Sequence, residues 1–303
     1  TGVQTCALPI CSGAFLIAAN NKLGLELARV RSGSLFPLQK DIQRARRDVL
    51  THCIHGVDLN PMAVELCKVS LWINAAVEDA PLNFLDHHIQ CGNSLVGATP
   101  ELLSQGIPDE AYNPVTGDDK ALAASLKRRN RLARVGAVSL PFQVTLITDH
   151  AALRRWLEAR NQAETKPALA EKAFMEYQAS AEKWDSRLPF DLWCAAFFAP
   201  LQPGQPIPIT QDVRQAQANP KQVSAELIAL ARSLAEEHRF FHWHLAFPEV
   251  FDQAGQGGFD VVLGNPPWEM INLEEKEFFD GKEDRIVNAG TGAQRKKLIE
   301  SLA

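Results

Sequence analysis

Residues 257–268 read GGFDVVLGNPPW, a glycine turn, a short apolar run and a proline corner. The run Phe259–Gly264 has the length and composition of a buried strand. The two prolines after it lack backbone donors and hold φ near one value, and they push Asn265 toward an extended conformation. The result is a stiff corner at the carboxyl end of a strand, which is where open α/β sheets bind ligands. The stretch therefore predicts an α/β fold with a ligand site at this corner.

The chemistry of this corner favours an amino group as its ligand. The side-chain oxygen of Asn265 and the carbonyl of Pro266 both accept hydrogen bonds, and neither Pro266 nor Pro267 has a backbone N–H to donate. Trp268 adds a flat face for a planar ring. Two acceptors beside an aromatic face fit an exocyclic amine on a nucleobase. The alternative interpretation is a structural proline corner with a core tryptophan.

Upstream of the corner, strand and helix patterns alternate. Apolar spacing predicts helices over about Ala14–Val30, Leu38–His52 and Met62–Val77. Short strands are expected at Cys53–Asp58 and in the strand-to-turn segment Ile89–Leu95. Pro61 suits the first position of the third helix. Strand, helix and strand in succession indicate a parallel sheet.

Three polar or glycine-bearing segments are candidates for a nucleoside site. Ser12–Phe15 forms a small turn that opens a helix, although a strand and a glycine are expected where Ile10 and Cys11 stand. Asp58 ends a strand, where nucleoside-binding α/β folds hold ribose hydroxyls, with the alternative that it is an N-cap of the next helix. Asn93 either contacts an adenine amino group or ring nitrogen, or is a turn asparagine.

The middle of the chain has a different texture. Residues 104–245 are mostly polar and helical, and the proline-bearing segment Leu201–Pro208 is a loop. A basic cluster within Lys127–Arg134 is either a solvated helix face or a contact for DNA phosphates. The helices expected in this region cover about Leu122–Arg134, Ala168–Trp184 and Val223–Phe241.

Composition narrows the function classes. The net charge of −5 argues against a basic protein that coats nucleic acid. DNA binding through a local basic patch remains compatible with this charge. Six scattered cysteines without a CxxC pair indicate reduced thiols in a cytoplasmic protein. We expect no membrane association, because no apolar run reaches the roughly 18 residues of a span. We also expect no metal, and a structural role for His52 and His55.

In combination, these motifs resemble a known family. The order of Ser12–Phe15, Asp58, Gly92–Leu95 and Asn265–Trp268 is similar to that of amino-directed DNA methyltransferases. The closer likeness is to the large adenine-N6 methyltransferases of restriction–modification and phage-defence systems. It covers both ends of residues 12–303 and is weakest in the middle. Its most specific element is the Asn-Pro-Pro-Trp motif.

The resemblance implies a fold, a cofactor and site residues. The fold would be a Rossmann-like S-adenosylmethionine-dependent core, incomplete in this chain, with a large and mainly helical insertion. S-adenosyl-L-methionine would lie along the turn, with its ribose on Asp58. Its adenine would lie near Leu59 and Asn93, and a target adenine flipped from double-stranded DNA would meet the corner. The implied cofactor residues are Cys11, Ser12, Gly13, Ala14, Phe15, Asp58, Leu59 and Asn93, and the implied catalytic residues are Asn265, Pro266, Pro267 and Trp268.

The predicted organisation has four parts. Residues 1–10 are a non-native leader, 11–103 the cofactor half of the core, 104–245 the insertion, and 246–303 the catalytic motif with following helices. We expect a fragment with little activity alone, and partner subunits in the parent system. Two other functions stay open: a same-fold methyltransferase acting on a protein glutamine amide or RNA, and a non-catalytic helical binding module.

The leader prediction rests on Thr1–Ile10. This segment resembles the in-frame translation of a sequencing-library adaptor, whose last base would turn a glycine codon at position 11 into a cysteine codon. We therefore expect Cys11 to stand for a glycine, with a Cβ where a cofactor needs close backbone approach. We also expect the first strand of the core to be missing.

Overall fold

The computed structural model describes residues 5–8, 13–77, 85–135, 151–160, 166–251 and 257–264, with the single positions 285, 288, 294, 298 and 299. The chain divides into two compact units, Thr1–Asn265 and Pro266–Ala303. The sheet and all the named helices belong to the first unit. Of the predicted site residues, Cys11, Ser12 and Asn265–Trp268 lie outside the described residues.

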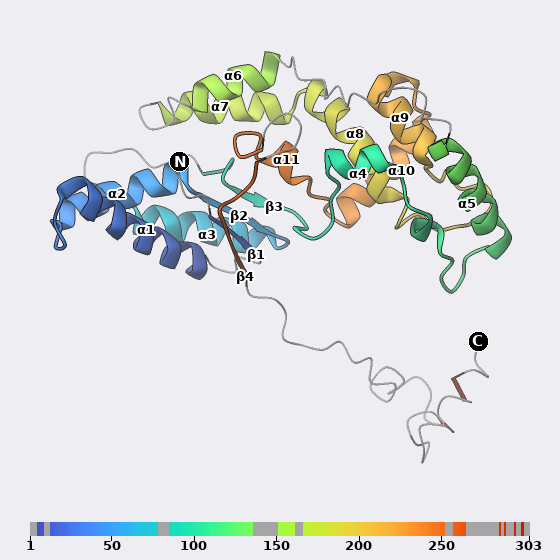
Figure 1. Cartoon of the computed structure of the whole chain (residues 1–303), viewed down its shortest axis with the longest axis horizontal. Helices are drawn as coiled ribbons and strands as arrows, with labels where there is room; N and C mark the ends of the chain where they lie inside the picture. Colours follow the sequence, from blue (N-terminus) through green and yellow to red (C-terminus); the bar gives the residue numbers. More distant parts are fainter. Residues whose placement is uncertain are drawn as a thin grey trace. The chain divides into compact units, whose positions relative to one another are not determined.

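A four-stranded parallel sheet with the order β3-β2-β1-β4 forms one part of this unit (Figure 1). The strands are β1 (Thr5–Leu8), β2 (Ile54–Asp58), β3 (Ile89–Cys91) and β4 (Val261–Gly264). Ala7 pairs with Gly56, Leu8 with Gly264, and Asp58 with Cys91. Because all the strands are parallel, their carboxyl ends meet at one edge of the sheet.

The expectation that the first strand is missing was wrong. Thr5–Leu8 is β1, and it pairs with both β2 and β4. A position between two strands satisfies the backbone N–H and C=O groups of any residue except proline, so pairing there makes few demands on sequence. Strand formation by these residues is therefore compatible with either a native or a foreign origin.

Three helices pack with the sheet: α1 (Ala14–Ser32), α2 (Gln39–His52) and α3 (Pro61–Asn74). Leu16, Leu50 and Leu71 of these helices form one cluster with Ile54 and Ile89 of the strands. α1 and α2 approach closely at Gly24, where an added Cβ would come within 2.6 Å of Arg46 Cγ. The predicted helices and β2 are confirmed to within a few residues at most of their ends, and β3 covers only Ile89–Cys91.

A second apolar cluster includes Val57, which lies at an odd-numbered position of β2, whereas Ile54 of the first cluster lies at an even-numbered one. Val57 packs with Phe241, Phe247 and Val250, which follow the helical region in sequence. His55 is fully buried, and its Nε2 lies 3.2 Å from Glu249 Oε1. This burial and pairing agree with the structural role expected for His55.

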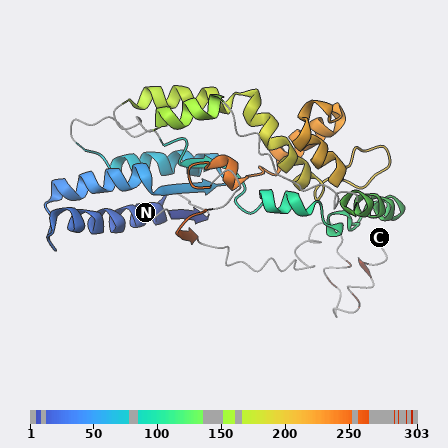
Figure 2. The ribbon, with the colours of Figure 1, turned by 45° about the horizontal axis from the view of Figure 1, so that its top comes forward.

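Between β3 and β4 the described chain is helical and has its own core. Leu103, Tyr112, Leu126, Phe190 and Val213 belong to one buried cluster. α6 (Ala151–Arg160) and α7 (Pro167–Gln178) lie side by side and share a smaller cluster around Trp156 and Phe174 (Figure 2). The elements are α4 (Pro100–Gln105), η1 (Asp109–Tyr112), α5 (Lys120–Val135), α6 (Ala151–Arg160), α7 (Pro167–Gln178), α8 (Ala181–Ala195), α9 (Thr210–Ala218), η2 (Pro220–Gln222), α10 (Ala225–Glu237) and α11 (Trp243–Ala246).

Two boundaries in this region differ from the prediction. The stretch Ala168–Trp184 is two helices rather than one, because the Ser180 side chain accepts a hydrogen bond from the Lys183 N–H and caps α8. α4 begins at Pro100, so the boundary expected between residues 103 and 104 falls inside a helix. No helix among the described residues is long and apolar enough to cross a membrane.

Candidate functional site

The candidate site lies at the carboxyl edge of the sheet. The carbonyl oxygen of Asp58, the last residue of β2, accepts a hydrogen bond of 2.9 Å from the Gly92 N–H. The Cys91 thiol donates to the Leu59 carbonyl at 3.6 Å. The segments after β2 and β3 are therefore held in contact. Asp58, Leu59 and Asn93, which were predicted from separate motifs, share this edge.

The turn before α1 packs against α3, the helix that follows Asp58 in the chain. Gly13 is buried with φ of 88°, a left-handed conformation that favours glycine, and it caps α1. An added Cβ there would lie 2.8 Å from Cys67 Sγ. Burial, with a smaller contribution from the Asp58 carboxylate, raises the pKa of the Cys67 thiol to about 12. Ala14 and Phe15 are exposed beside this turn.

Asp58 does not cap the following helix. Its Oδ1 accepts a 2.7 Å hydrogen bond from the Asn60 N–H, and the Asn60 side chain accepts from the Met62 N–H and caps α3. The N-cap alternative for Asp58 was therefore wrong, and the capping residue is two positions later. Asp58 is 6% exposed and Leu59 is 52% exposed, so a buried carboxylate stands beside an open apolar side chain.

Asn93 is a turn residue with one side-chain group already used. Its Oδ1 accepts from the Leu95 N–H at 3.2 Å, and its own N–H donates to the Arg239 carbonyl at 2.7 Å. These hydrogen bonds are those of a turn asparagine, one of the two interpretations of Asn93. The Nδ2 group has no hydrogen-bond partner among the described residues, which leaves Asn93 a donor.

The segment that returns from the helices is fitted closely against the turn after β3. The Phe241 N–H donates to the Val96 carbonyl at 2.8 Å, and a Cβ added to Gly97 would lie 2.1 Å from the Phe241 carbonyl oxygen. A Cβ added to Gly92 would lie 2.4 Å from the Phe241 ring. Glycine at these positions is therefore required for the helical region to join the sheet edge.

We expect Gly97→Ala to lower the free energy of unfolding by about 3 kcal/mol, because a backbone carbonyl must move. Gly204→Ala is the matched control. A Cβ there meets nothing within 4 Å, and its φ of 84° costs only about 1 kcal/mol in alanine. Urea denaturation followed by circular dichroism measures both variants. Equal losses in the two would show that the contact at Gly97 is unimportant.

A buried polar network at this junction was missed by sequence reasoning. His242 Nδ1 accepts from the Ala98 N–H at 3.1 Å, so Nε2 carries the proton and donates to Asp191 Oδ1 at 2.9 Å. Arg187 Nε lies 2.8 Å from Asp191 Oδ2, and Arg187 Nη2 donates to the Phe240 carbonyl at 3.0 Å. The only local signal was the i, i+4 spacing of Arg187 and Asp191.

A neighbouring histidine makes stability depend on pH. His244 is buried against the Phe190 ring, and neither of its ring nitrogens has a hydrogen-bond partner within the described part of the chain. Burial, with a smaller contribution from His242, lowers its pKa from 6.5 to about 3. The unfolded chain therefore binds a proton at this residue below pH 6.5 that the folded chain does not bind. Stability is fully present above pH 6.5 and declines as the pH falls toward 3.

We expect His244→Phe to reduce the loss of unfolding free energy between pH 7 and pH 5 by about 2 kcal/mol, from 1.36 kcal/mol for each unit of pKa difference. At pH 7 the variant should be as stable as the wild type, because an unsatisfied polar ring is replaced by an apolar one. Urea midpoints at the two pH values give the comparison. The exposed His52→Phe variant should keep the wild-type pH dependence, and an unchanged dependence in His244→Phe would contradict the assignment.

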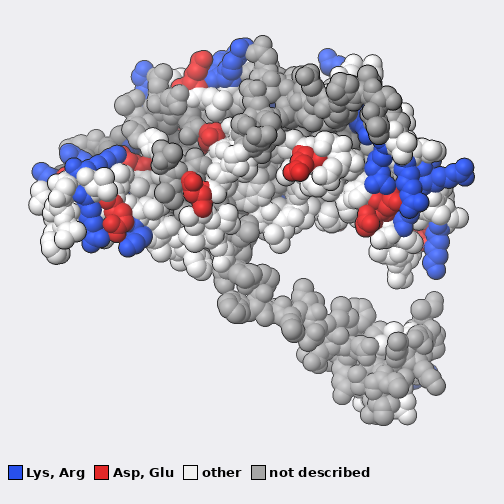
Figure 3. All heavy atoms as spheres, viewed as in Figure 1, with Lys and Arg blue, Asp and Glu red and all other residues white. Residues whose placement is uncertain are grey.

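The basic cluster lies on α5, where Figure 3 shows lysine and arginine side chains gathered at the right of the view. Asp109 pairs with both Arg131 and Arg134, and Lys127 donates to Asn113 at 2.6 Å. Arg128 and Arg129 are exposed. The cluster is thus partly neutralised, and its contact with DNA stays a prediction. Among the described residues no group of three or more His, Cys, Asp or Glu side chains could hold a metal ion.

Comparison with known proteins supplies the family. Residues 52–297 match the family described as Eco57I restriction-modification methylase. The chain belongs to the Eco57I restriction-modification methylase family. It is also 25% identical over 292 residues to a Methanocaldococcus jannaschii protein provisionally named a type II restriction enzyme and methyltransferase. That alignment covers 88% of this chain and 22% of the relative, so the chain spans less than a quarter of the relative's length. No solved structure matches.

Membership of the Eco57I methylase family assigns the chain to methyltransferases of the restriction-modification type. The match begins at residue 52, so it includes Asp58, Asn93 and the Asn-Pro-Pro-Trp motif. A methylase requires a methyl donor. Among the described residues, the carboxyl edge carries a buried carboxylate at Asp58, a left-handed glycine at Gly13 and an unpaired amide donor at Asn93.

Proposed function

We propose that the chain is the cofactor-binding and catalytic part of an S-adenosylmethionine-dependent DNA methyltransferase that acts on the amino group of adenine. The observation that carries the proposal is the gathering of Gly13, Asp58 and Asn93 at one sheet edge in a methylase-family chain. β4 ends at this edge with Gly264, and Asn265 follows it directly in sequence.

The strand order supports a Rossmann-like core. A doubly wound sheet with the order 3-2-1-4 places its ligand at the carboxyl ends of the strands, next to the turn after the first strand. The described sheet has this order. We infer that β1 to β4 are the first four strands of such a core, with the helical region inserted between β3 and β4.

The described residues fit S-adenosylmethionine. Asp58 would accept hydrogen bonds from ribose hydroxyls, and exposed Leu59 would lie against the adenine. Because Asn93 Oδ1 is engaged, its Nδ2 would donate to a ring nitrogen of that adenine. The absence of a Cβ at Gly13 lets the turn before α1 pack against Cys67 of α3, and the cofactor would lie along this turn.

The bound cofactor would supply an electrophilic methyl group. The chain would act on the target adenine, whose amino N–H groups donate to the Asn265 side-chain oxygen and the Pro266 carbonyl. These acceptors would increase the electron density on the nitrogen and orient it for reaction, while Trp268 would stack on the ring and Pro267 would stiffen the corner. The methyl group would replace one amino proton of the adenine, and that proton would leave to solvent. Most of the rate enhancement would come from alignment and electrostatics.

We also propose that this chain works within a longer enzyme of a restriction or phage-defence system. The support is that it spans 22% of its M. jannaschii relative. Target recognition, double-stranded DNA binding and contacts with partner subunits would involve that longer protein. We likewise infer that Thr1–Ile10 is a non-native leader and that Cys11 replaces a glycine. Sequencing the source DNA across codon 11 tests this, and an intact gene encoding Thr1–Ile10 would overturn it.

The function is tested by transfer of a tritiated methyl group from S-adenosylmethionine by the full-length enzyme. Duplex DNA, RNA and total protein are offered as acceptors in parallel. We expect label in DNA and N6-methyladenine after digestion and mass spectrometry. Label confined to RNA or to glutamine side chains would replace the DNA proposal, and no transfer to any acceptor would reject it.

A further inference from the structure

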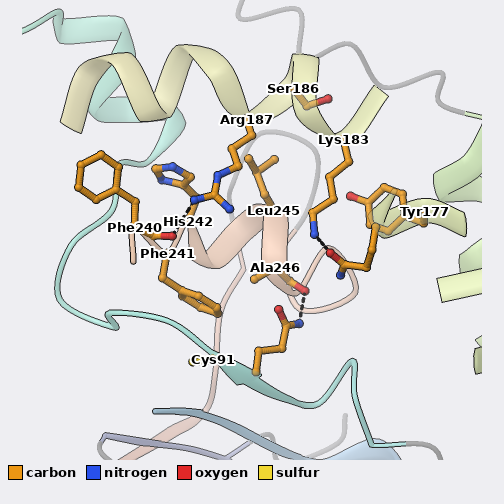
Figure 4. A pocket seen from close by; sticks show the side chains of 12 residues that line it. Cys91, Tyr177, Lys183, Ser186, Arg187, Phe240, Phe241, His242, Leu245 and Ala246 are labelled. Carbon is orange, nitrogen blue, oxygen red and sulfur yellow. Dashed lines mark hydrogen bonds between the residues drawn. The ribbon is translucent and has the colours of Figure 1, made fainter. Parts of the chain in front are cut away.

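A polar pocket lies where the helical region meets the end of β3. Its volume is about 180 Å³, and Figure 4 shows its lining side chains. They come from four parts of the fold: β3, α7, the first half of α8, and the segment from Phe240 to α11. The lining residues are Gln90, Cys91, Tyr177, Gln178, Lys183, Ser186, Arg187, Phe240, Phe241, His242, Leu245 and Ala246.

Positive charge dominates this pocket. Lys183, Ser186 and Arg187 stand three and four residues apart and so share one face of α8. No aspartate or glutamate is among the twelve lining residues. Asp191 lies behind Arg187 and is fully buried, so it offsets one of the two cations. His242 adds no charge while its Nδ1 accepts from the Ala98 N–H.

Lys183 has no counter-charge among the described residues. Its ammonium donates to the neutral side-chain oxygen of Gln178 and lies 5.7 Å from the centre of the Tyr177 ring. Burial, with a smaller contribution from Arg187, lowers the pKa of Lys183 to about 8. A half-buried ammonium without a carboxylate is costly, and such groups concentrate at functional sites.

Arg187 is preorganised for a ligand. Its Nε is held by Asp191 and its Nη2 by the Phe240 carbonyl, which fixes the plane of the guanidinium. Nη1 has no hydrogen-bond partner among the described residues. In Figure 4 the Arg187 and Lys183 side chains project from α8 toward α11, on either side of Leu245. A tetrahedral oxyanion has the acceptors that two such cations require.

We propose that this pocket binds a backbone phosphate of the DNA substrate, with Lys183 and Arg187 as its cationic donors. The proposal rests on the proposed function. The position supports DNA as the source of the phosphate, because the lining residue Cys91 pairs with Asp58 at the carboxyl edge. A phosphate held there would fix the register of the strand beside the edge where the flipped base is expected.

The first test is the salt dependence of binding to a 30-base-pair duplex of mixed sequence, measured by fluorescence anisotropy with the full-length enzyme. Lys183→Gln should weaken binding several-fold and reduce the slope of log K against log salt by about 0.9, the value for one lost phosphate contact. Lys183→Arg should restore the slope. The exposed Lys221→Gln variant should match the wild type, and a wild-type slope in Lys183→Gln would overturn the proposal.

The second test reads Lys183 directly and needs no methyl transfer. Lysines are labelled by reductive ¹³C-methylation, and the Lys183 signal is the one missing in Lys183→Gln. Inorganic phosphate should raise its titration midpoint, whereas potassium chloride at matched ionic strength should not. The groups facing Lys183 that titrate or carry charge are Arg187, Tyr177, Cys91 and His242.

The outcomes separate the sources of the phosphate. A rise with both phosphate and duplex supports the proposal. A rise with inorganic phosphate but not with duplex, or no duplex binding by the wild type, overturns the assignment to DNA. No rise with either ligand overturns the site itself. Binding of S-adenosylhomocysteine should be equal in wild type and Lys183→Gln. If neither protein binds it, the proposed function is rejected, whereas the phosphate measurement remains valid.

Discussion

Asn265→Ala in the full-length enzyme is expected to lower the rate of methyl transfer to DNA by about 100- to 1,000-fold, the size of effect seen when one preorganised polar group is removed from an active site. The side-chain oxygen of Asn265 is one of the two acceptors proposed for the adenine amino group. Alanine keeps the proline corner and removes that acceptor. Because the residue would act on the substrate amine and not on the cofactor, the affinity for S-adenosylhomocysteine should not change.

The matched variant is Asn265→Asp. Aspartate keeps an oxygen acceptor at the same place, so part of the activity should remain. Single-turnover transfer of tritiated methyl groups measures the chemical step, and isothermal titration calorimetry measures cofactor affinity. Wild-type turnover in Asn265→Ala would refute the catalytic role. Loss of cofactor binding together with turnover would indicate a structural role instead.

Asp58→Ala is expected to weaken binding of S-adenosylmethionine to the 303-residue chain by about 100-fold. Two hydrogen bonds from ribose hydroxyls to a buried carboxylate are together worth about 3 kcal/mol, and 1.4 kcal/mol corresponds to a tenfold change in Kd. Asp58 is 6% exposed, and its carboxylate is oriented by a hydrogen bond from the Asn60 N–H. It is therefore positioned before the ligand arrives. Equilibrium dialysis with labelled cofactor gives the ratio of affinities.

Asp58→Asn removes the negative charge of this side chain and keeps its shape. Asparagine keeps an acceptor for the Asn60 N–H, so we expect the unfolding midpoint of the wild type and a loss of affinity of about tenfold, as for one weakened bond. Asp41→Ala in α2 is the control for a general change in charge. Equal cofactor affinity in wild type and Asp58→Ala would remove Asp58 from the site.

Local sequence signals predicted most helices and β2 correctly because each depends on neighbours a few residues away. The Asn60-Pro61 start of α3 is such a signal, and so is the short segment Cys53–Asp58, which was predicted as a buried strand. One local signal was overlooked: Ser180, three residues before Lys183, caps α8 and divides the stretch expected to be one helix. The N-cap alternative for Asp58 failed for a similar reason, since Asn60 supplies the cap.

Long-range contacts were beyond prediction. His242 and Asp191 are 51 residues apart and Arg239 and Cys91 are 148 apart, yet each pair is in contact. Nothing in the sequence near Lys183 indicates that it would face the end of β3 without a carboxylate. The pairing of Thr5–Leu8 within the sheet is a further case, because backbone hydrogen bonds are made with little regard to side chains.

The sequence alone determined the α/β character, the helical nature of the described middle region and the order of the motifs. In a parallel sheet that order is enough to send the segments after each strand to one edge, because every strand points the same way. Only the tertiary structure decided which side chains meet there. It also decided that the Nδ2 group of Asn93 has no partner among the described residues, and that Lys183 lies without a carboxylate among them. These features depend on packing between residues far apart in the chain, and the free energy of such contacts leaves no periodic or local pattern to read.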